Sequence, residues 1–399
     1  MITINAHSLS SSAKASLSDL IQNSLGKAFP CLSLCVIHHG QVVINAYGCS
    51  AEDIVFSQDT LFDLASITKL FTSTTVLQLI SAGRLHLHTP VREVIPEFAR
   101  TDQRWTDAAQ CPHTLAKLPL TQKALLIDPD KVQIHHLLTH TSGLHAWSDL
   151  FLNLGPAPGL PMQGQPPLQK QQQAVDLISR LGFRSRPGPI VYSDLGFILL
   201  GEAVSRLRGK GLDKVLLTDV LSPVGLSDIL FNPVTQCQRS NFETVSTEWD
   251  ARWRNRRLWG EVHDENACAM GGVAGHAGLF GSAQSVAQFG LAWLEGGADA
   301  WGIDPRLAQQ AVSANVQDGN QIRGLGFICK SIQGASCGRY FSSRSFGHSG
   351  FTGTSLWVDP QNQLIVANLT NSVQYGRDMQ AISQFKIELH EMLAALFPR

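Results

Sequence analysis

Hydrophobic and polar positions near the N-terminus follow first the period of a helix and then that of strands. In residues 9–29 the apolar side chains recur mostly at spacings of three or four, which predicts an amphipathic helix that covers a sheet. Two apolar runs follow, residues 31–37 and 42–47, joined by a short polar link that contains Gly40. A glycine between two such runs is typical of a tight hairpin turn. The pattern therefore predicts two antiparallel strands after the helix.

The C-terminal part of the chain predicts a second hairpin. Residues 354–358 and 364–369 are apolar runs, and the link between them contains the aspartate, proline and asparagine that favour turns. Residues 377–396 then have the spacing of a closing helix. The two ends of the chain thus resemble each other in their predicted elements.

The middle of the chain is mostly helical in pattern. Apolar spacing predicts helices over residues 70–80, 174–181, 196–206 and 213–221. The simplest arrangement is an α/β fold of the α+β kind, with a sheet domain assembled from both termini and an inserted all-helical domain. We expect the sheet domain at residues 1–69 and 265–399 and the helical domain at residues 70–264, with the catalytic site between them.

Two stretches interrupt the helical part and are predicted to be long loops. They are residues 100–130 and residues 153–167, the second with repeated proline and glycine. Loops of this length are often binding elements or lids. Solvated decoration without a role is the alternative, so gating of the site by these loops stays an open question.

The composition of the chain bears on which kind of molecule it binds. Of the 399 residues 44% are hydrophobic and 16% charged, which is enough apolar surface for a large core. Lys and Arg number 31 against 32 Asp and Glu, so the formal net charge of -1 provides no broad field to attract nucleic acid or anionic lipid. A small molecule is the expected partner, and nothing in the sequence indicates the oligomeric state.

The N-terminus and the cysteines predict a compartment. The first twelve residues lack the charged start and apolar core of a secretory signal, and no apolar run approaches the roughly 20 residues needed to span a membrane. We therefore expect a soluble, cytoplasmic protein. The eight cysteines form no Cys-x-x-Cys pair, which predicts reduced thiols that fill the core rather than a disulfide framework or a zinc site.

The strongest chemical signal is Ser66-x-x-Lys69, directly before an apolar helical run. If Ser66 opens that helix, Lys69 lies one turn later on the same face, and its amine can reach the hydroxyl. A serine hydroxyl needs such a neighbour to become a nucleophile, and a helix N-terminus also offers N–H groups to an oxyanion. The alternative is that Ser66 is an ordinary helix cap.

A second segment places Tyr192 two residues before Asp194, just ahead of another helical run. A phenol beside a lysine ammonium would have a lowered pKa, because the positive charge favours the phenolate. Tyr192 could then act as a general base. Taken alone, the residue is better explained as a packed tyrosine with a satisfied hydroxyl.

A third segment, His348-Ser349-Gly350-Phe351, leads into the predicted strand at residues 354–358. A strand edge here could place the N–H of Phe351 opposite that of Ser66, which would complete a two-donor oxyanion hole. The segment differs from a Gly-x-Ser-x-Gly nucleophile elbow because position 351 is not glycine.

Together these three segments resemble a family. Ser66-x-x-Lys69, Tyr192-x-Asp194 and His348-Ser349-Gly350 stand in the order of the Ser-x-x-Lys, Tyr-x-Asn and Lys-Thr-Gly boxes of penicillin-binding proteins and class C β-lactamases. Residues 134–144 and 260–280 also resemble segments of this β-lactamase-related serine hydrolase family, which includes the family VIII carboxylesterases. The resemblance covers roughly residues 15–395.

The resemblance implies a fold and a set of roles. The family's fold is an antiparallel sheet flanked by helices, together with a helical domain. Ser66 would be the acylated nucleophile, with Lys69 and Tyr192 handling its proton and Asp194 assisting by a hydrogen bond. Ser66 and Phe351 would supply the oxyanion donors. His348, Ser349 and Gly350 would contact the substrate.

Two departures from the family's boxes bear on the substrate. His348 stands where the family has a lysine that holds a substrate carboxylate, and a histidine of ordinary pKa is mostly neutral at pH 7. Asp194 stands where the family has asparagine and adds a negative charge near Lys69. Both changes lead us to expect neutral esters or amides as substrates rather than penicillins.

The remaining histidines raise the question of a metal. Positions 135, 136, 140, 263 and 276 are histidine, but none forms His-Glu-x-x-His or another familiar ligand spacing, so we expect no metal site and no organic cofactor. For His263 two readings stay open, support of a loop and lining of the acyl pocket.

The sequence thus predicts a serine hydrolase that forms an acyl-enzyme on Ser66, with carboxylesterase activity as the leading function. One alternative is an amidase or peptidase acting on peptidoglycan fragments, and weak β-lactamase activity is compatible with either. The non-enzyme alternative is a penicillin-binding-like module that has lost turnover. The presence of Ser66, Lys69 and Tyr192 argues against that module.

Overall fold

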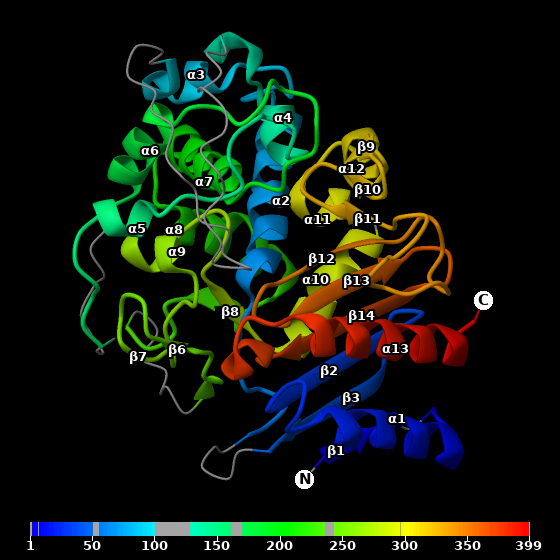
Figure 1. Ribbon diagram of the computed structural model, residues 1–399. Helices are drawn as coiled ribbons and strands as arrows, with labels where there is room; N and C mark the ends of the chain where they lie inside the picture. Colours follow the sequence, from blue (N-terminus) through cyan, green and yellow to red (C-terminus); the bar gives the residue numbers. More distant parts are fainter. Residues whose placement is uncertain are drawn as a thin grey trace.

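A nine-stranded antiparallel sheet lies between two layers of helices in the computed structural model (Figure 1). The structure describes residues 2–6, 8–50, 56–99, 128–160, 170–235, 243–295 and 297–398. The strand order is β1-β3-β2-β14-β13-β12-β11-β10-β9, so strands from both ends of the chain form one sheet. Helices α1 and α13 cover one face and α10 covers the other. This is the fold class that the sequence predicts.

The strands are short except at the centre of the sheet. Their bounds are β1 Ile2–Asn5, β2 Cys31–His38, β3 Gln41–Cys49, β4 Phe62–Asp63, β5 Leu230–Phe231, β6 Trp249–Asp250, β7 Arg256–Arg257, β8 Leu279–Gly281, β9 Val316–Asp318, β10 Gln321–Arg323, β11 Ile328–Cys329, β12 Phe346–Ser349, β13 Ser355–Asp359 and β14 Leu364–Thr370.

The helices lie mostly between β4 and β9. Their bounds are α1 Ser11–Ser24, α2 Thr68–Ser81, α3 Val91–Val94, α4 Ile134–Leu138, α5 Leu150–Asn153, α6 Gln171–Arg180, α7 Asp194–Arg208, α8 Leu212–Val215, α9 Glu265–Ala269, α10 Ala283–Leu294, α11 Ala298–Trp301, α12 Pro305–Ala311 and α13 Gln380–Leu396. None of the described helices is both long enough and apolar enough to cross a membrane.

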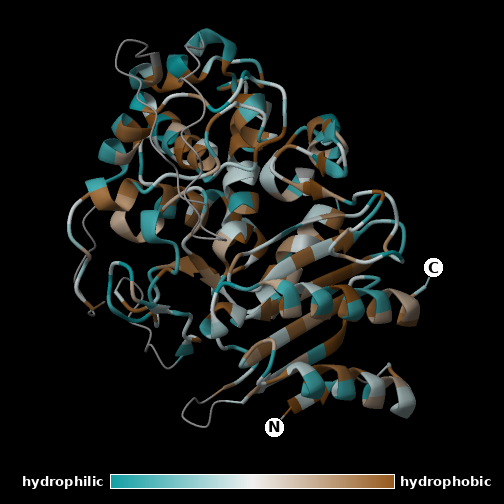
Figure 2. Cartoon of the chain, viewed as in Figure 1, coloured by the Kyte–Doolittle hydropathy of each residue, from teal (hydrophilic) through white to brown (hydrophobic). Residues whose placement is uncertain are grey.

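Strand β14 shows why the sheet carries helices on both faces. Leu364 and Val366 belong to the apolar cluster under α1 and α13, whereas Ile365, Ala367 and Leu369 belong to the cluster under α10. Side chains of a strand alternate between its faces, so a strand with apolar residues on both faces needs cover on both. The amphipathic helix α13 supplies part of that cover and shows alternating teal and brown turns in Figure 2.

The two predicted hairpins are confirmed, and some other boundaries differ. The first helix ends at Ser24 rather than at residue 29, because Leu25 is extended and Gly26 has a φ of 80°. The helix expected over residues 213–221 is the short α8 followed by a π-helix, Leu216–Leu221. Strands β1 and β9–β11 were not predicted. Of the two long loops, residues 100–127 and 161–169 lie outside the described residues.

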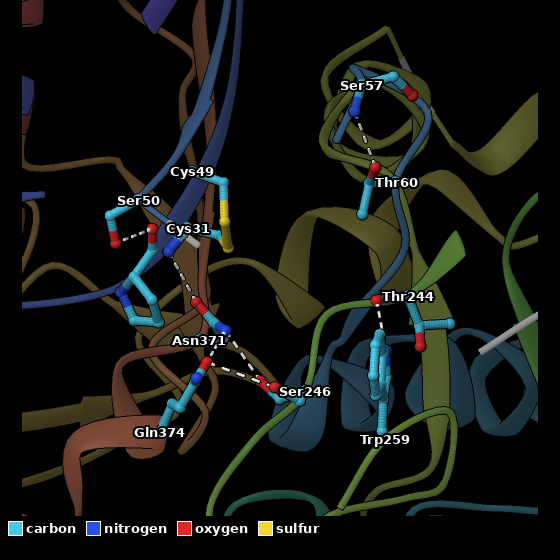
Figure 3. The surroundings of a disulfide bond; sticks show 11 residues. Cys31, Cys49, Ser50, Ser57, Thr60, Thr244, Ser246, Trp259, Asn371 and Gln374 are labelled. Carbon is cyan, nitrogen blue, oxygen red and sulfur yellow. Dashed lines mark hydrogen bonds between the residues drawn. A yellow bond between two sulfur atoms is a disulfide. The ribbon is translucent and has the colours of Figure 1, made fainter. Parts of the chain in front are cut away.

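One expectation about the cysteines is wrong. Cys31 and Cys49 lie directly opposite each other in the β2–β3 pair and form a disulfide (Figure 3). The four cysteines described as free thiols are Cys35, Cys268, Cys329 and Cys337. The sequence could not show this pairing, because it depends on the register of the hairpin. The predicted compartment stays a prediction.

The disulfide gives a test of the hairpin register. Its partners are 18 residues apart, and closing a loop of that size stabilises a protein by about 3 kcal/mol. A Cys31→Ser, Cys49→Ser variant should lose about that much free energy of unfolding in urea titrations. Non-reducing peptide mapping of the parent protein should recover the linked peptide. Recovery of both cysteines as free thiols would contradict the pairing.

Candidate active site

Ser66 lies in a tight turn that a buried carboxylate holds in place. It belongs to the short 3-10 helix Ala65–Ile67, which leads directly into α2. The preceding Ala65 has a φ of 46°, a conformation that costs a non-glycine residue of order 1–2 kcal/mol. Asp63 holds the turn, since its carboxylate accepts the N–H of Ala65 at 2.8 Å and that of His263 at 2.6 Å. Burial raises the pKa of Asp63, while those two N–H groups act in the opposite direction.

Lys69 is the second residue of α2, one turn after Ser66, and it is fully buried beside three oxygen atoms. Its Nζ is 2.8 Å from Ser66 Oγ, 2.7 Å from Asp194 Oδ1 and 3.0 Å from the carbonyl oxygen of His276. The contacts with Ser66 and His276 are hydrogen bonds, and the contact with Asp194 is an ion pair. Burial alone would lower the pKa of Lys69, but Asp194 and Tyr192 together outweigh it and the pKa is raised. The predicted approach of amine to hydroxyl is present, and the amine is held as an ammonium.

Tyr192 and Asp194 reach Ser66 and Lys69 from the start of α7. Ser193 caps that helix by accepting the N–H of Gly196 with its hydroxyl. The phenol of Tyr192 lies beside Ser66 and Lys69, whose side chains affect its pKa, and Lys69 Nζ lies 5.0 Å from the centre of its ring. The expected lowering of the Tyr192 pKa is wrong: burial raises it, and the lowering effect of Lys69 is opposed by the nearby Asp194 charge. Tyr192 is therefore a neutral phenol at pH 7.

The segment at residues 348–351 lies against the turn that carries Ser66. His348 and Ser349 end β12, and the hydroxyl of Thr354 donates to the Leu64 carbonyl. A Cβ at Gly350 would come within 2.6 Å of the Leu64 oxygen and would also overlap Thr354, so only glycine fits there. This close approach brings Phe351 into the same region as Ser66.

His348 is neutral and buried. Burial, together with the charges of Lys69 and Arg323, holds its pKa well below the usual value. Its Nδ1 lies 2.7 Å from the carbonyl oxygen of Ser349, to which it donates, so Nε2 is the unprotonated nitrogen. The residue that replaces the family's lysine thus carries no positive charge in this site.

The predicted substrate contact His263 lies near Phe351. Its ring centre is 5.5 Å from that of Phe351, and its Nε2 is 3.7 Å from Glu248. Its backbone N–H supports Asp63, so it has a structural contact with the serine turn. Whether the ring also lines the acyl pocket stays a prediction.

Three residues near the site were not singled out by the sequence for the contacts they make. The carbonyl oxygen of His276 accepts from Lys69, and its ring is fixed by Asp264 at 2.8 Å. His140 Nδ1 accepts the N–H of Ser193 at 3.0 Å. The guanidinium of Arg323 lies 5.4 Å from the Tyr192 ring centre. In the sequence, the glycines around His276 and the histidine at position 140 only weakly indicated a place in the site. No sequence feature indicated Arg323.

Among the described residues no group of three or more His, Cys, Asp or Glu side chains is arranged to hold a metal ion. The histidines at 135 and 136 lie together on α4, with ring centres 3.8 Å apart. The groups assembled at Ser66 are a hydroxyl, an ammonium and a phenol.

Fold and site are those of a serine hydrolase of the penicillin-recognising type, in which Ser66 lies in the turn before a central helix and Lys69 lies at the start of that helix. The chain belongs to the Beta-lactamase family, whose model matches residues 17–390.

Three known proteins illustrate the similarity. A relative from Escherichia coli (strain K12), named "Putative D-alanyl-D-alanine carboxypeptidase", is 27% identical over 88% of this chain and 80% of its own length. The structure of EstCE1, a hydrolase with promiscuous acyltransferase activity, has a TM-score of 0.66 at 20% identity over 94% of this chain and 100% of its own. A penicillin-binding protein homologue from Caulobacter crescentus has a TM-score of 0.65 at 17% identity, covering 98% and 99% of the two chains.

The Lys69–Asp194 contact predicts a shift in the pH dependence of activity. Asp194 raises the pKa of Lys69, so the ammonium persists to higher pH than it would alone. Asp194→Asn should lower that pKa and move the alkaline limb of the kcat/KM profile to lower pH. The profile is measured with a p-nitrophenyl ester and corrected for spontaneous hydrolysis. The exposed Asp59→Asn is the matched control, and an unmoved limb in Asp194→Asn would contradict the role of the ammonium.

Proposed function

We propose that this serine hydrolase cleaves small esters or amides through an acyl-enzyme on Ser66. The single observation that supports this most strongly is the chain of contacts from Asp194 through Lys69 to Ser66, with distances of 2.7 and 2.8 Å. A cation at that distance stabilises the alkoxide that forms when a serine attacks a carbonyl. An ordinary capping serine would have no reason to be paired with a fully buried lysine.

Because both Lys69 and Tyr192 are protonated at pH 7, the proton of Ser66 needs a relay. In the acylation step Ser66 Oγ bonds to the substrate carbonyl carbon while its proton passes to the Tyr192 oxygen and the phenol proton passes to the leaving group. The Lys69 ammonium stays in place and stabilises the negative charge on Oγ. The N–H groups of Ser66 and Phe351 are the proposed donors to the carbonyl oxygen. Water then reverses the relay and releases the acid.

Carboxylesterase activity is the leading substrate proposal, supported by the neutral His348 and by the likeness to EstCE1 in fold. The second candidate is cleavage of a D-alanyl-D-alanine type of peptide, supported by the name of the Escherichia coli relative. The two candidates share every step at Ser66 and differ only in what holds the rest of the substrate.

The test is mass spectrometry of the intact protein after brief exposure to a p-nitrophenyl ester, a β-lactam and a muramyl peptide. We expect an adduct on Ser66 with the preferred acyl donor, and we expect Ser66→Ala to lose adduct and turnover, by at least about 1,000-fold in kcat. Ser16→Ala, at an exposed position of α1, is the control and should keep the parent rate. Wild-type turnover in Ser66→Ala would overturn the mechanism.

A further inference from the structure

Lys386 is a charged residue type on the apolar side of α13. That helix packs on the central strands of the sheet through the apolar side chains of Ile382, Phe385, Leu389 and Leu393 (Figure 1). Lys386 lies on the same side and is only 7% exposed. Within the described parts of the chain no carboxylate forms an ion pair with it, and burial lowers its pKa to about 7. At pH 8 the amine is therefore mostly neutral.

The amine of Lys386 reaches the link between β12 and β13, which carries Phe351. It donates to the carbonyl oxygen of Thr354, with Nζ 3.0 Å from that oxygen. The same oxygen accepts the backbone N–H of Gly350 at 2.8 Å, and this bond closes the link. The carbonyl thus has two donors, one from inside the link and one from α13. A helix that supplies no side chain to the serine site therefore holds the segment that does.

Side-chain hydroxyls hold the same link against the turn that carries Ser66. Thr352 donates to the carbonyl of Asp63 at 2.7 Å, and Thr354 donates to the carbonyl of Leu64 at 3.2 Å. Thr354 is therefore bound twice, by its carbonyl to α13 and by its hydroxyl to the residues just before the serine. A shift of this residue would move the link relative to the nucleophile.

Packing alone does not explain a lysine at position 386. An amine buried without an opposite charge costs stability, whereas methionine has a similar length and no such cost. Two more polar side chains lie under α13 beside the link. Ser355 follows Thr354 and pairs with Asn368, which shares the face of Val366, and the polar side-chain atoms of both are buried without a hydrogen-bond partner among the described residues. Polar groups kept at a cost in stability indicate a functional constraint.

We propose that Lys386 is a positioning residue for the reaction at Ser66. Through the carbonyl of Thr354 it fixes the link between β12 and β13, so that the backbone N–H of Phe351 points at the carbonyl oxygen of the substrate. This inference rests on the proposed function, since it assigns a residue to the oxyanion site of that reaction. Such donors stabilise the developing charge only if they are already in place, and a misplacement of about 1 Å can cost about 100-fold in rate.

The test variant is Lys386→Met, because methionine fills a similar space without a donor. With a p-nitrophenyl ester it should lower kcat and kcat/KM equally, by about 10- to 100-fold, since the lost interaction acts in the transition state. Lys386→Gln, whose amide N–H can donate to the same carbonyl, should recover part of kcat. Lys27→Met, at an exposed position, is the matched control and should keep the parent kcat.

A merely structural role for Lys386 makes the opposite prediction for stability. If the lysine served only to hold α13 on the sheet, Lys386→Met would unfold at a lower urea concentration and would keep the parent kcat per folded enzyme. We expect the variant to unfold at the same or a higher urea concentration, because a buried amine without an opposite charge has been removed. A loss of stability, or an unchanged kcat, would each overturn the proposal.

Hydrogen exchange separates this proposal from the proposed function, because it requires no turnover. The amides of Gly350 and Gly353 are hydrogen-bonded within the link, to the carbonyls of Thr354 and Gly350. Their exchange in Lys386→Met, followed by mass spectrometry of peptides, should be about 10-fold faster, with no change in the β2–β3 hairpin. If exchange rises but the parent enzyme forms no adduct on Ser66, the lysine positions the link and the hydrolase mechanism fails. If the adduct forms and exchange is unchanged, the positioning role fails and the hydrolase mechanism stands.

Discussion

The buried ammonium of Lys69 is the interaction on which the active site depends. Three acceptors surround it, and they come from three parts of the chain: Ser66 before α2, Asp194 at the start of α7 and the carbonyl of His276. Removing an ion from water costs several kcal/mol, so a lysine with no exposed surface is stable only if all three contacts form together. The ammonium thus links the helices to the segment before β8, and assembly of the site is coupled to the packing of the fold.

That coupling explains the polar character of the region around α2. The helix is buried over almost its whole length, yet it carries Thr72, Ser73, Thr74 and Thr75. Thr72 donates to the carbonyl of Gly275, one residue before the His276 carbonyl that accepts from Lys69. A buried hydroxyl is stable when it is hydrogen-bonded. Here the bond from Thr72 positions the Gly275–His276 segment, whose carbonyl accepts from Lys69. The same segment approaches α7 so closely that a Cβ at Gly275 would overlap the backbone of Phe197 and Gly201.

The sequence predicted those parts of the site that depend on local spacing. Ser66 and Lys69 are three residues apart at a helix start, so their contact follows from helical geometry. The hairpins followed from alternation and turn residues. The direction of the Tyr192 pKa could not be predicted, because it depends on how deeply the phenol is buried. Arg323 gave no signal, because its place beside Tyr192 depends on the order of β10, β11 and β12 in the sheet. The φ of Ala65 and the Cys31–Cys49 pair likewise depend on tertiary contacts.

The two departures from the family's boxes, Asp194 and His348, are best understood together, through their combined effect on the charge of the site. Asp194 brings a negative charge into the site, and Lys69 is bound to it as an ammonium, so the pair is neutral as a unit. His348 is neutral as well, since it lies within the field of two cations and away from water. The net charge that remains next to the phenol is that of Arg323. A second lysine at position 348 would add a further buried cation beside Lys69 and Arg323, with Asp194 already paired, and would be costly until a doubly charged ligand arrived. Because Arg323 on β10 already supplies a positive charge, the site can accommodate a neutral histidine at position 348 at a lower cost in free energy than a second lysine.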